Sequence, residues 1–141
     1  MVSASARSKI SIFGSLAMIF GVSGCATLED PGGRFPEGKV VDSRTLQQEW
    51  KNPDSLLKLK GNGEFEAENL KARYFECGDG GGEHSKGGQG KWQEGEDGDS
   101  SEVFLKFADG CSATFWLGEI DDVLVLWTEF EVDGDLIMLR N

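Results

Sequence analysis

Histidine is nearly absent from this 141-residue chain, in which His84 is the only one. Nucleophilic catalysis needs a nucleophile, a base and an orienting group, and histidine serves most often as the base. His84 lies in the segment 78–90, where seven of thirteen residues are glycine. Because glycine loses the most backbone entropy on ordering, we expect a flexible loop there. The sequence therefore predicts no catalytic residue, no cofactor and no enzyme.

Basic residues are also scarce, with 14 Lys and Arg against 25 Asp and Glu and a net charge of −11. Binding to nucleic acid needs phosphate-neutralising cations, so we expect none. A cationic partner would suit this charge, although solubility alone also explains it. The acidic segment 94–102 has oxygen ligands suited to calcium but lacks the EF-hand order, so we expect no metal site.

No run of apolar residues is long enough for a comfortable membrane span, which needs about 20 residues. The longest runs from Ile10 to Val22 and contains Gly and Ser. It follows Arg7 and Lys9, and residues 1–24 contain no acidic side chain. A basic start, a short apolar middle and small residues at the end predict a secretory signal peptide over residues 1–24.

The end of this segment, Val22-Ser23-Gly24-Cys25, resembles the lipobox of bacterial lipoproteins. The resemblance implies cleavage before Cys25 and a diacylglycerol on its thiol, which would anchor the chain to the cell membrane on its extracytoplasmic face. An ordinary signal with a chance cysteine, or an uncleaved anchor helix, are the alternatives. We expect a lipid-anchored flexible tether over residues 25–42 and a domain over residues 43–141.

Cys77 and Cys111 remain after Cys25 is assigned to lipid. An even pair in an exported protein predicts a structural disulfide, because that compartment is oxidising. A redox or metal-binding pair is the alternative, but the chain has no C-x-x-C spacing.

Short apolar runs separated by Gly, Asn and Asp predict an all-β domain. Asn62-Gly63, Asp109-Gly110 and Asp133-Gly134 are hairpin signals. The segment 69–75 is ambiguous, and a single helical turn is possible there. We expect eight strands, at residues 46–51, 56–60, 64–68, around Trp92, and at 102–107, 112–117, 123–130 and 135–140.

Strands linked by hairpins in simple succession form a meander. Eight of them can close into an antiparallel up-and-down barrel, which removes exposed strand edges. We therefore predict a small lipocalin-like eight-stranded barrel, with a β-sandwich as the alternative. A barrel of this size holds side chains or one small ligand.

The motif Leu57-x-Leu59-Lys60-Gly61-Asn62-Gly63-Glu64-Phe65-x-Ala67-x-x-Leu70, followed by Gly90-Lys91-Trp92, resembles a pattern in small secreted actinobacterial lipoproteins. Asn62 replaces an Asp of that pattern, and Glu64 replaces a Thr. The resemblance implies the barrel and the lipobox, and it implies no activity.

Apolar residues occupy both faces of the last four expected strands, as in Val123-Leu124-Val125-Leu126-Trp127. A barrel strand that faces water should alternate. Either the outside is covered, by the tether around Phe35 and Val40 or by residues 70–75, or it is an exposed interaction patch. Candidate binding residues are the four tryptophans: Trp50, Trp92, Trp116 and Trp127.

These observations favour a binding module for a small amphiphile or a protein. The alternatives are an inhibitor of a cationic enzyme and a hydrolase that uses carboxylates. A calcium-stiffened envelope component is a further reading.

Overall fold

A computed structural model of the chain describes residues 35–73, 75–78, 84–129 and 135–141. The predicted signal peptide, the motif residues Val22, Ser23 and Gly24, and Cys25 lie outside these residues. The predicted Asp133-Gly134 turn also lies outside them.

The described residues form nine strands and one short helix. The helix, α1, is a single turn that Asp42 caps by accepting a hydrogen bond from the Thr45 N–H at 2.9 Å. Leu46 ends this turn, so the prediction that a strand starts at residue 46 is wrong, because the aspartate cap initiates a helical turn first. The elements are β1 (Glu37–Gly38), α1 (Ser43–Leu46), β2 (Glu49–Lys51), β3 (Leu56–Leu59), β4 (Glu64–Lys71), β5 (Ser85–Asp97), β6 (Ser100–Phe107), β7 (Ser112–Ile120), β8 (Val123–Glu129) and β9 (Leu136–Arg140).

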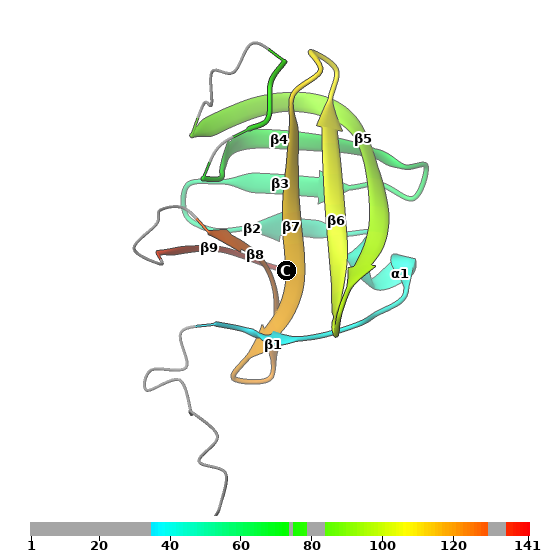
Figure 1. Ribbon diagram of the computed structural model, residues 1–141, viewed down its shortest axis with the longest axis vertical. Helices are drawn as coiled ribbons and strands as arrows, with labels where there is room; N and C mark the ends of the chain where they lie inside the picture. The colour runs from blue at the N-terminus through cyan, green and yellow to red at the C-terminus, as the bar shows by residue number, and fades with distance from the viewer. Residues whose placement is uncertain (1–34, 74, 79–83, 130–134) are drawn as a thin grey trace, which may run out of the picture.

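Strands β2 to β9 pair antiparallel in chain order, and β9 returns to β2, which closes an eight-stranded up-and-down barrel. Figure 1 shows the wall of this barrel, with β1 crossing its lower end. The barrel prediction is confirmed. Strand β1 is an additional strand that pairs with the end of β7 through Glu37 opposite Glu119 and Gly38 opposite Gly118.

The second half of the glycine-rich segment, residues 85–90, is strand and not the loop that the sequence suggested. Strand β5 begins at Ser85 and bends strongly around the barrel, as Figure 1 shows, so most of the predicted loop after residue 84 is strand. A Cβ on Gly90 would lie 2.0 Å from the carbonyl oxygen of Lys106, and Gly88 has a φ of 125°. Gly90 therefore permits the close approach of β5 to β6, whereas Gly88 adopts a backbone conformation that other residues rarely take.

Two hairpin turns predicted from sequence are confirmed. Gly63, in the turn between β3 and β4, has a φ of 78°, and Gly110, between β6 and β7, has a φ of 95°. Both values lie in the left-handed region that glycine adopts without steric cost. The Asn-Gly and Asp-Gly pairs therefore set the register of these two hairpins.

Stability is expected to fall in acid, in part through the β6–β7 turn. Asp109 accepts hydrogen bonds from Lys86 and, at 3.1 Å, from the Cys111 N–H. The hydrogen bond from Lys86 is the main reason that the pKa of Asp109 lies below its ordinary value. A carboxyl with a lowered folded pKa adds stability above its unfolded pKa, and this contribution is lost as the pH falls through the folded value.

We therefore expect the urea midpoint of the wild type to fall as the pH is lowered from about 7 to about 3. The fall should be less steep in Asp109→Asn, which cannot titrate there. Equal pH slopes in the two proteins would contradict this assignment.

The barrel interior is filled by side chains. Trp50, Phe65 and Phe115 are each 0% exposed, so no water-sized space touches them. Phe107 packs edge-on against both Phe65 and Phe75, with ring centroids 4.9 and 5.6 Å apart. All eight barrel strands contribute to this core, through Trp50, Leu57, Leu59, Phe65, Leu70, Trp92, Val103, Leu105, Phe107, Phe115, Leu117, Leu126 and Leu139.

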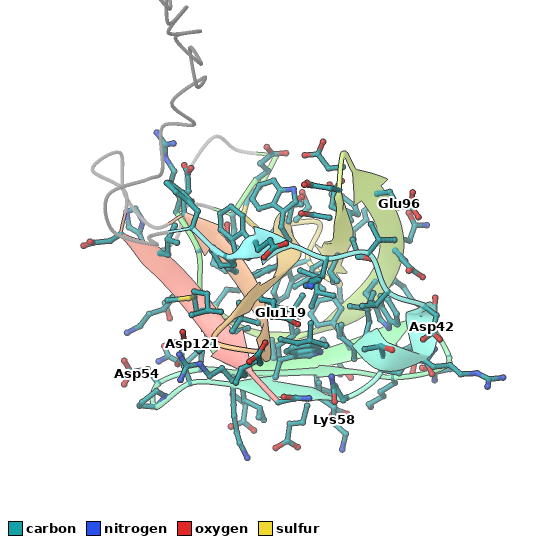
Figure 2. All side chains as sticks on the ribbon, turned by 90° about the horizontal axis from the view of Figure 1, so that it is seen from below. Asp42, Asp54, Lys58, Glu96, Glu119 and Asp121 are labelled. Atoms are coloured by element: carbon teal, nitrogen blue, oxygen red, sulfur yellow. A yellow bond between two sulfur atoms is a disulfide. The ribbon has the colours of Figure 1, made fainter. Side chains whose placement is uncertain are left out.

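Contacts outside the barrel's own strand pairing lie at both ends of the barrel. At the lower end in Figure 1, Lys39 follows β1 and its Nζ lies 3.1 Å from Glu119 Oε1. This hydrogen bond is the main cause that raises the pKa of Lys39. Figure 2, seen from below, places Glu119 near the centre of this end. At the other end Phe75 is 1% exposed, and the predicted disulfide joins Cys77 to Cys111.

Candidate functional site

The outer face of β6 to β9 carries a continuous band of large apolar side chains. Trp116 on β7 lies opposite Trp127 on β8, which lies opposite Met138 on β9. Phe104 on β6 pairs with Thr114 and is therefore diagonal to Trp116. We call Phe104, Trp116, Trp127 and Met138 the outer aromatic strip. The two indole rings lie 5.5 Å apart between centroids.

Residues before β2 cover one side of this strip. The ring of Phe35 packs edge-on against Trp127 at a centroid distance of 5.9 Å. Pro36 is buried over Gly118, where a Cβ would lie 2.4 Å from the Cβ of Pro36. Val125, on the outer face opposite Gly118, is 0% exposed. Residues 35–42, which the sequence assigned to the flexible tether, thus lie against the barrel, because β1 pairs with β7 and Pro36 fits over a glycine.

The cover is partial, because Phe104 remains 37% exposed. In the other predicted cover, Leu70, Ala72 and Phe75 pack into the core. Arg73 lies beside the strip, where its N–H donates to the Glu129 carbonyl at 3.0 Å, but it leaves Phe104 exposed. Phe104 thus stays at the surface, and Trp116, Trp127 and Met138 are only partly buried. An exposed apolar patch of this kind on a folded domain often marks an interaction site.

A groove of about 270 Å³ opens beside Phe104 and Trp116 of the strip. Phe104 and Trp116 form its apolar wall, and Glu102 lies opposite Trp116 in the β6–β7 register. The Trp116 indole N–H donates to Asp97 Oδ2 at 3.3 Å. The groove's charged lining is mainly acidic, with Glu76, Glu102 and Glu129 against Arg73. Arg73 lies 3.8 Å from Glu129, and both side chains are nearly half exposed, so this ion pair is weak.

The four predicted binding tryptophans fall into two pairs. Trp50 and Trp92 point into the barrel, and their indole N–H groups donate to the carbonyls of Leu46 at 3.0 Å and Lys60 at 2.9 Å. They are therefore part of the packed interior. Trp116 and Trp127 lie outside, in the strip. Trp127 Nε1 is buried and has no hydrogen-bond partner among the described residues.

The acidic segment 94–102 forms the hairpin between β5 and β6. Glu94 accepts a hydrogen bond from the Ser43 hydroxyl, and Asp97 accepts the Trp116 indole N–H, so two carboxylates already have protein partners. In the described part of the chain, no group of three or more His, Cys, Asp or Glu side chains could hold a metal ion.

His84 lies just before β5, exposed, with Nδ1 2.7 Å from the carbonyl oxygen of Arg73. Its own carbonyl accepts a hydrogen bond from the Ala72 N–H at 3.2 Å. These contacts hold the start of β5 against the segment that follows β4. The sequence did not indicate this role, because the pairing depends on residues distant in the chain.

The sequence analysis did not predict the acidic residues that border the strip. Glu102 and Glu129 are outward positions of β6 and β8, and only the register places them beside Phe104 and Trp116. The one available signal was Glu102 directly before the apolar run of residues 103–105.

The fold and site define a closed antiparallel barrel with a packed interior and an aromatic outer strip. Comparisons of the chain with known protein families, with curated proteins and with solved structures find no match. Across the residues that the structure describes, no helix is both long and apolar enough to cross a bilayer.

Proposed function

We propose that this chain is a lipid-anchored extracytoplasmic binding module whose outer aromatic strip docks a protein with a basic surface. The observation that carries the proposal is the contrast between the two faces of β6 and β7. Phe115, inside, is 0% exposed, whereas Phe104, outside, is 37% exposed. A filled interior leaves no room for an amphiphile, so the free apolar surface lies on the outside.

The shape of the site also favours a protein partner. Aromatic residues are enriched at the centres of protein interfaces, where they are surrounded by a polar rim. Here the aromatic centre is Phe104 and Trp116, and Glu102, Glu129 and Asp97 stand at its border. The strip therefore has the chemistry of an interface centre with an acidic rim.

Charge selects the class of partner. After removal of residues 1–24 the chain would keep twelve basic and 25 acidic residues, a net charge of −13. A field of this sign speeds the approach of cationic proteins and repels anionic membrane surfaces. A basic protein is therefore favoured over a lipid surface.

Lipid at Cys25 would set where the module works. Phe35 is ten residues beyond Cys25, and ten residues span at most about 35 Å. The strip begins beside Phe35, so it would stay within that distance of the bilayer. The proposed anchor and the strip thus act together to present the binding face near the membrane.

Phe104→Ser tests the proposal, with lysozyme as the cationic probe protein. We expect the wild type to bind lysozyme at low salt in titration calorimetry, and Phe104→Ser to bind it about tenfold more weakly, as the loss of a central aromatic contact predicts. Added salt should weaken binding in both proteins, because surface charges are screened.

Val123→Ser is the matched control. Val123 is 39% exposed, close to the value for Phe104, but it lies at the β7–β8 turn, away from the groove. Its binding should equal that of the wild type. Absence of any lysozyme complex, or equal losses in the two variants, would contradict docking of a basic protein on the strip.

A further inference from the structure

The seam that closes the barrel is short. Strands β2 and β9 share a single residue pair, Lys51 opposite Arg140, whereas β8 and β9 share five. Beyond that pair, two side-chain hydrogen bonds join the segments on either side of the seam. The Asn52 amide donates to the Met138 carbonyl at 3.3 Å, and the Asn141 amide donates to Gln48 Oε1 at 3.2 Å. Figure 1 shows β9 and β2 as neighbours in the wall. Within the described part of the chain, most of the seam edge of β9 therefore has no strand beside it.

Main-chain hydrogen-bonding groups of β9 point into this gap. In an antiparallel pair, alternate residues direct their N–H and C=O groups to opposite sides of the strand. The carbonyl of Met138 faces the seam, so Leu136 and Arg140, two residues away on either side, face it as well. Among the described residues, the N–H of Met138 and both main-chain groups of Leu136 find no strand partner there. Such an edge is a template for a further strand.

A groove of about 540 Å³ runs along this edge, a volume within the range of ligand-binding pockets. Its apolar lining comes from Leu136, Ile137, Met138 and Pro53. Its charged lining is Lys51, Lys71 and Arg140 with Asp54 as the one acid. Lys71 lies 3.1 Å from Asp54, and Figure 2 places Asp54 at the β2–β3 turn. The groove is thus locally basic on a chain of net charge −11.

We propose that this seam groove binds an extended peptide segment with carboxylate side chains, which adds as a strand beside β9. The main-chain groups of Leu136 and Met138 would supply strand pairing, and Lys51 and Arg140 would select the charge of the segment. Strand addition of this kind takes its affinity from main-chain hydrogen bonds and its specificity from the flanking side chains.

A second copy of the chain is a poorer occupant. Pairing two seam edges would place Lys51, Lys71 and Arg140 of each copy near those of the other, and like charges across an interface are costly. The seam groove also differs in charge from the groove at the outer aromatic strip. An acidic segment here and a basic protein there are two separable activities.

The probe is a fluorescein-labelled peptide of six alternating Val and Glu residues, measured by fluorescence anisotropy with the disulfide-bonded mature chain. We expect saturable binding that weakens about tenfold in Arg140→Glu, as the loss of one charge-assisted contact predicts. Lys58→Glu is the matched control, because Lys58 is an exposed lysine on β3 that points away from the barrel in Figure 2. It should bind like the wild type, and so should Phe104→Ser.

Two further peptides make the test specific. A Val-Lys peptide of equal length should not bind, and a Val-Glu peptide methylated on alternate main-chain nitrogens should lose binding, because it cannot complete the strand pairing. Binding of either peptide as tightly as the parent, or equal binding by Arg140→Glu and Lys58→Glu, would overturn the proposal. A concentration-dependent dimer in light scattering that disappears in Met138→Pro would assign the edge to a second copy instead.

Discussion

Phe115→Ala is expected to lower the free energy of unfolding by about 3–5 kcal/mol, the usual cost of removing a fully buried aromatic ring. Phe115 is 0% exposed and lies at the centre of β7, with Leu105 and Leu117 in the same core cluster. Its removal forfeits the transfer free energy of the ring and leaves a cavity that a closed barrel can shrink only slightly. Urea denaturation followed by far-UV circular dichroism measures the change.

Phe104→Ala provides the comparison within one β6–β7 hairpin. Phe104 faces outward and is 37% exposed, so we expect a much smaller loss, below about 1.5 kcal/mol, because less apolar surface leaves the core. Similar losses of stability in the two variants would mean that the interior is not packed as described. The barrel interior would then again be a candidate ligand-binding site.

Loss of the disulfide is expected to have an effect nearly as large. Cys77 and Cys111 close a loop with a sequence separation of 34 residues. The chain-entropy relation for a loop of that length gives a loss of roughly 3 to 4 kcal/mol in Cys77→Ser/Cys111→Ser. The measurement is the urea midpoint of the double variant against the oxidised wild type.

The wild type in reducing agent is the control for side-chain effects at the two positions. It should match the double variant, because both remove the same cross-link. A double variant as stable as the oxidised wild type would show that residues 75–78 are held by Phe75 and the Glu76–Ser112 bridge without help from the cross-link.

The barrel was predictable because the alternation of side chains carries the necessary information. In β4, Phe65 and Ala67 face inward between outward glutamates, as the sequence indicates. Two Gly-containing turns fixed how neighbouring strands connect, and antiparallel meander topology follows from short turns. The disulfide followed from the compartment that the signal segment implies.

The cover over the outer face was only partly predictable. Phe35 was one of two suggested covers, but the glycine that accepts Pro36, Gly118, lies 82 residues later in the chain. A contact between residues so far apart in the chain produces no pattern in the local sequence. The turn-forming composition of residues 35–42 fits a flexible tether and also fits a segment packed across the end of a barrel. Composition alone therefore could not distinguish the two.

The positions of the tryptophans also needed the structure. In Thr114-Phe115-Trp116-Leu117 both faces carry large apolar residues, so alternation cannot say which aromatic ring points inward. The register of β6 to β9 decides it, with Phe115 inside and Trp116 outside. The same ambiguity hid the acidic groove, because Glu102 and Glu129 meet the strip only across strands.

The central claim is that this barrel is filled and acts through its outer face. Fluorescence titration of the wild type with 1-aminoanthracene, a small neutral apolar probe, tests it most directly. The packed core around Trp50, Phe65 and Phe115 predicts no saturable one-to-one binding inside the barrel. Saturable one-to-one binding that persists in Phe104→Ser, and that the Val-Glu peptide does not displace from the seam groove, would place the ligand in the interior and contradict the account.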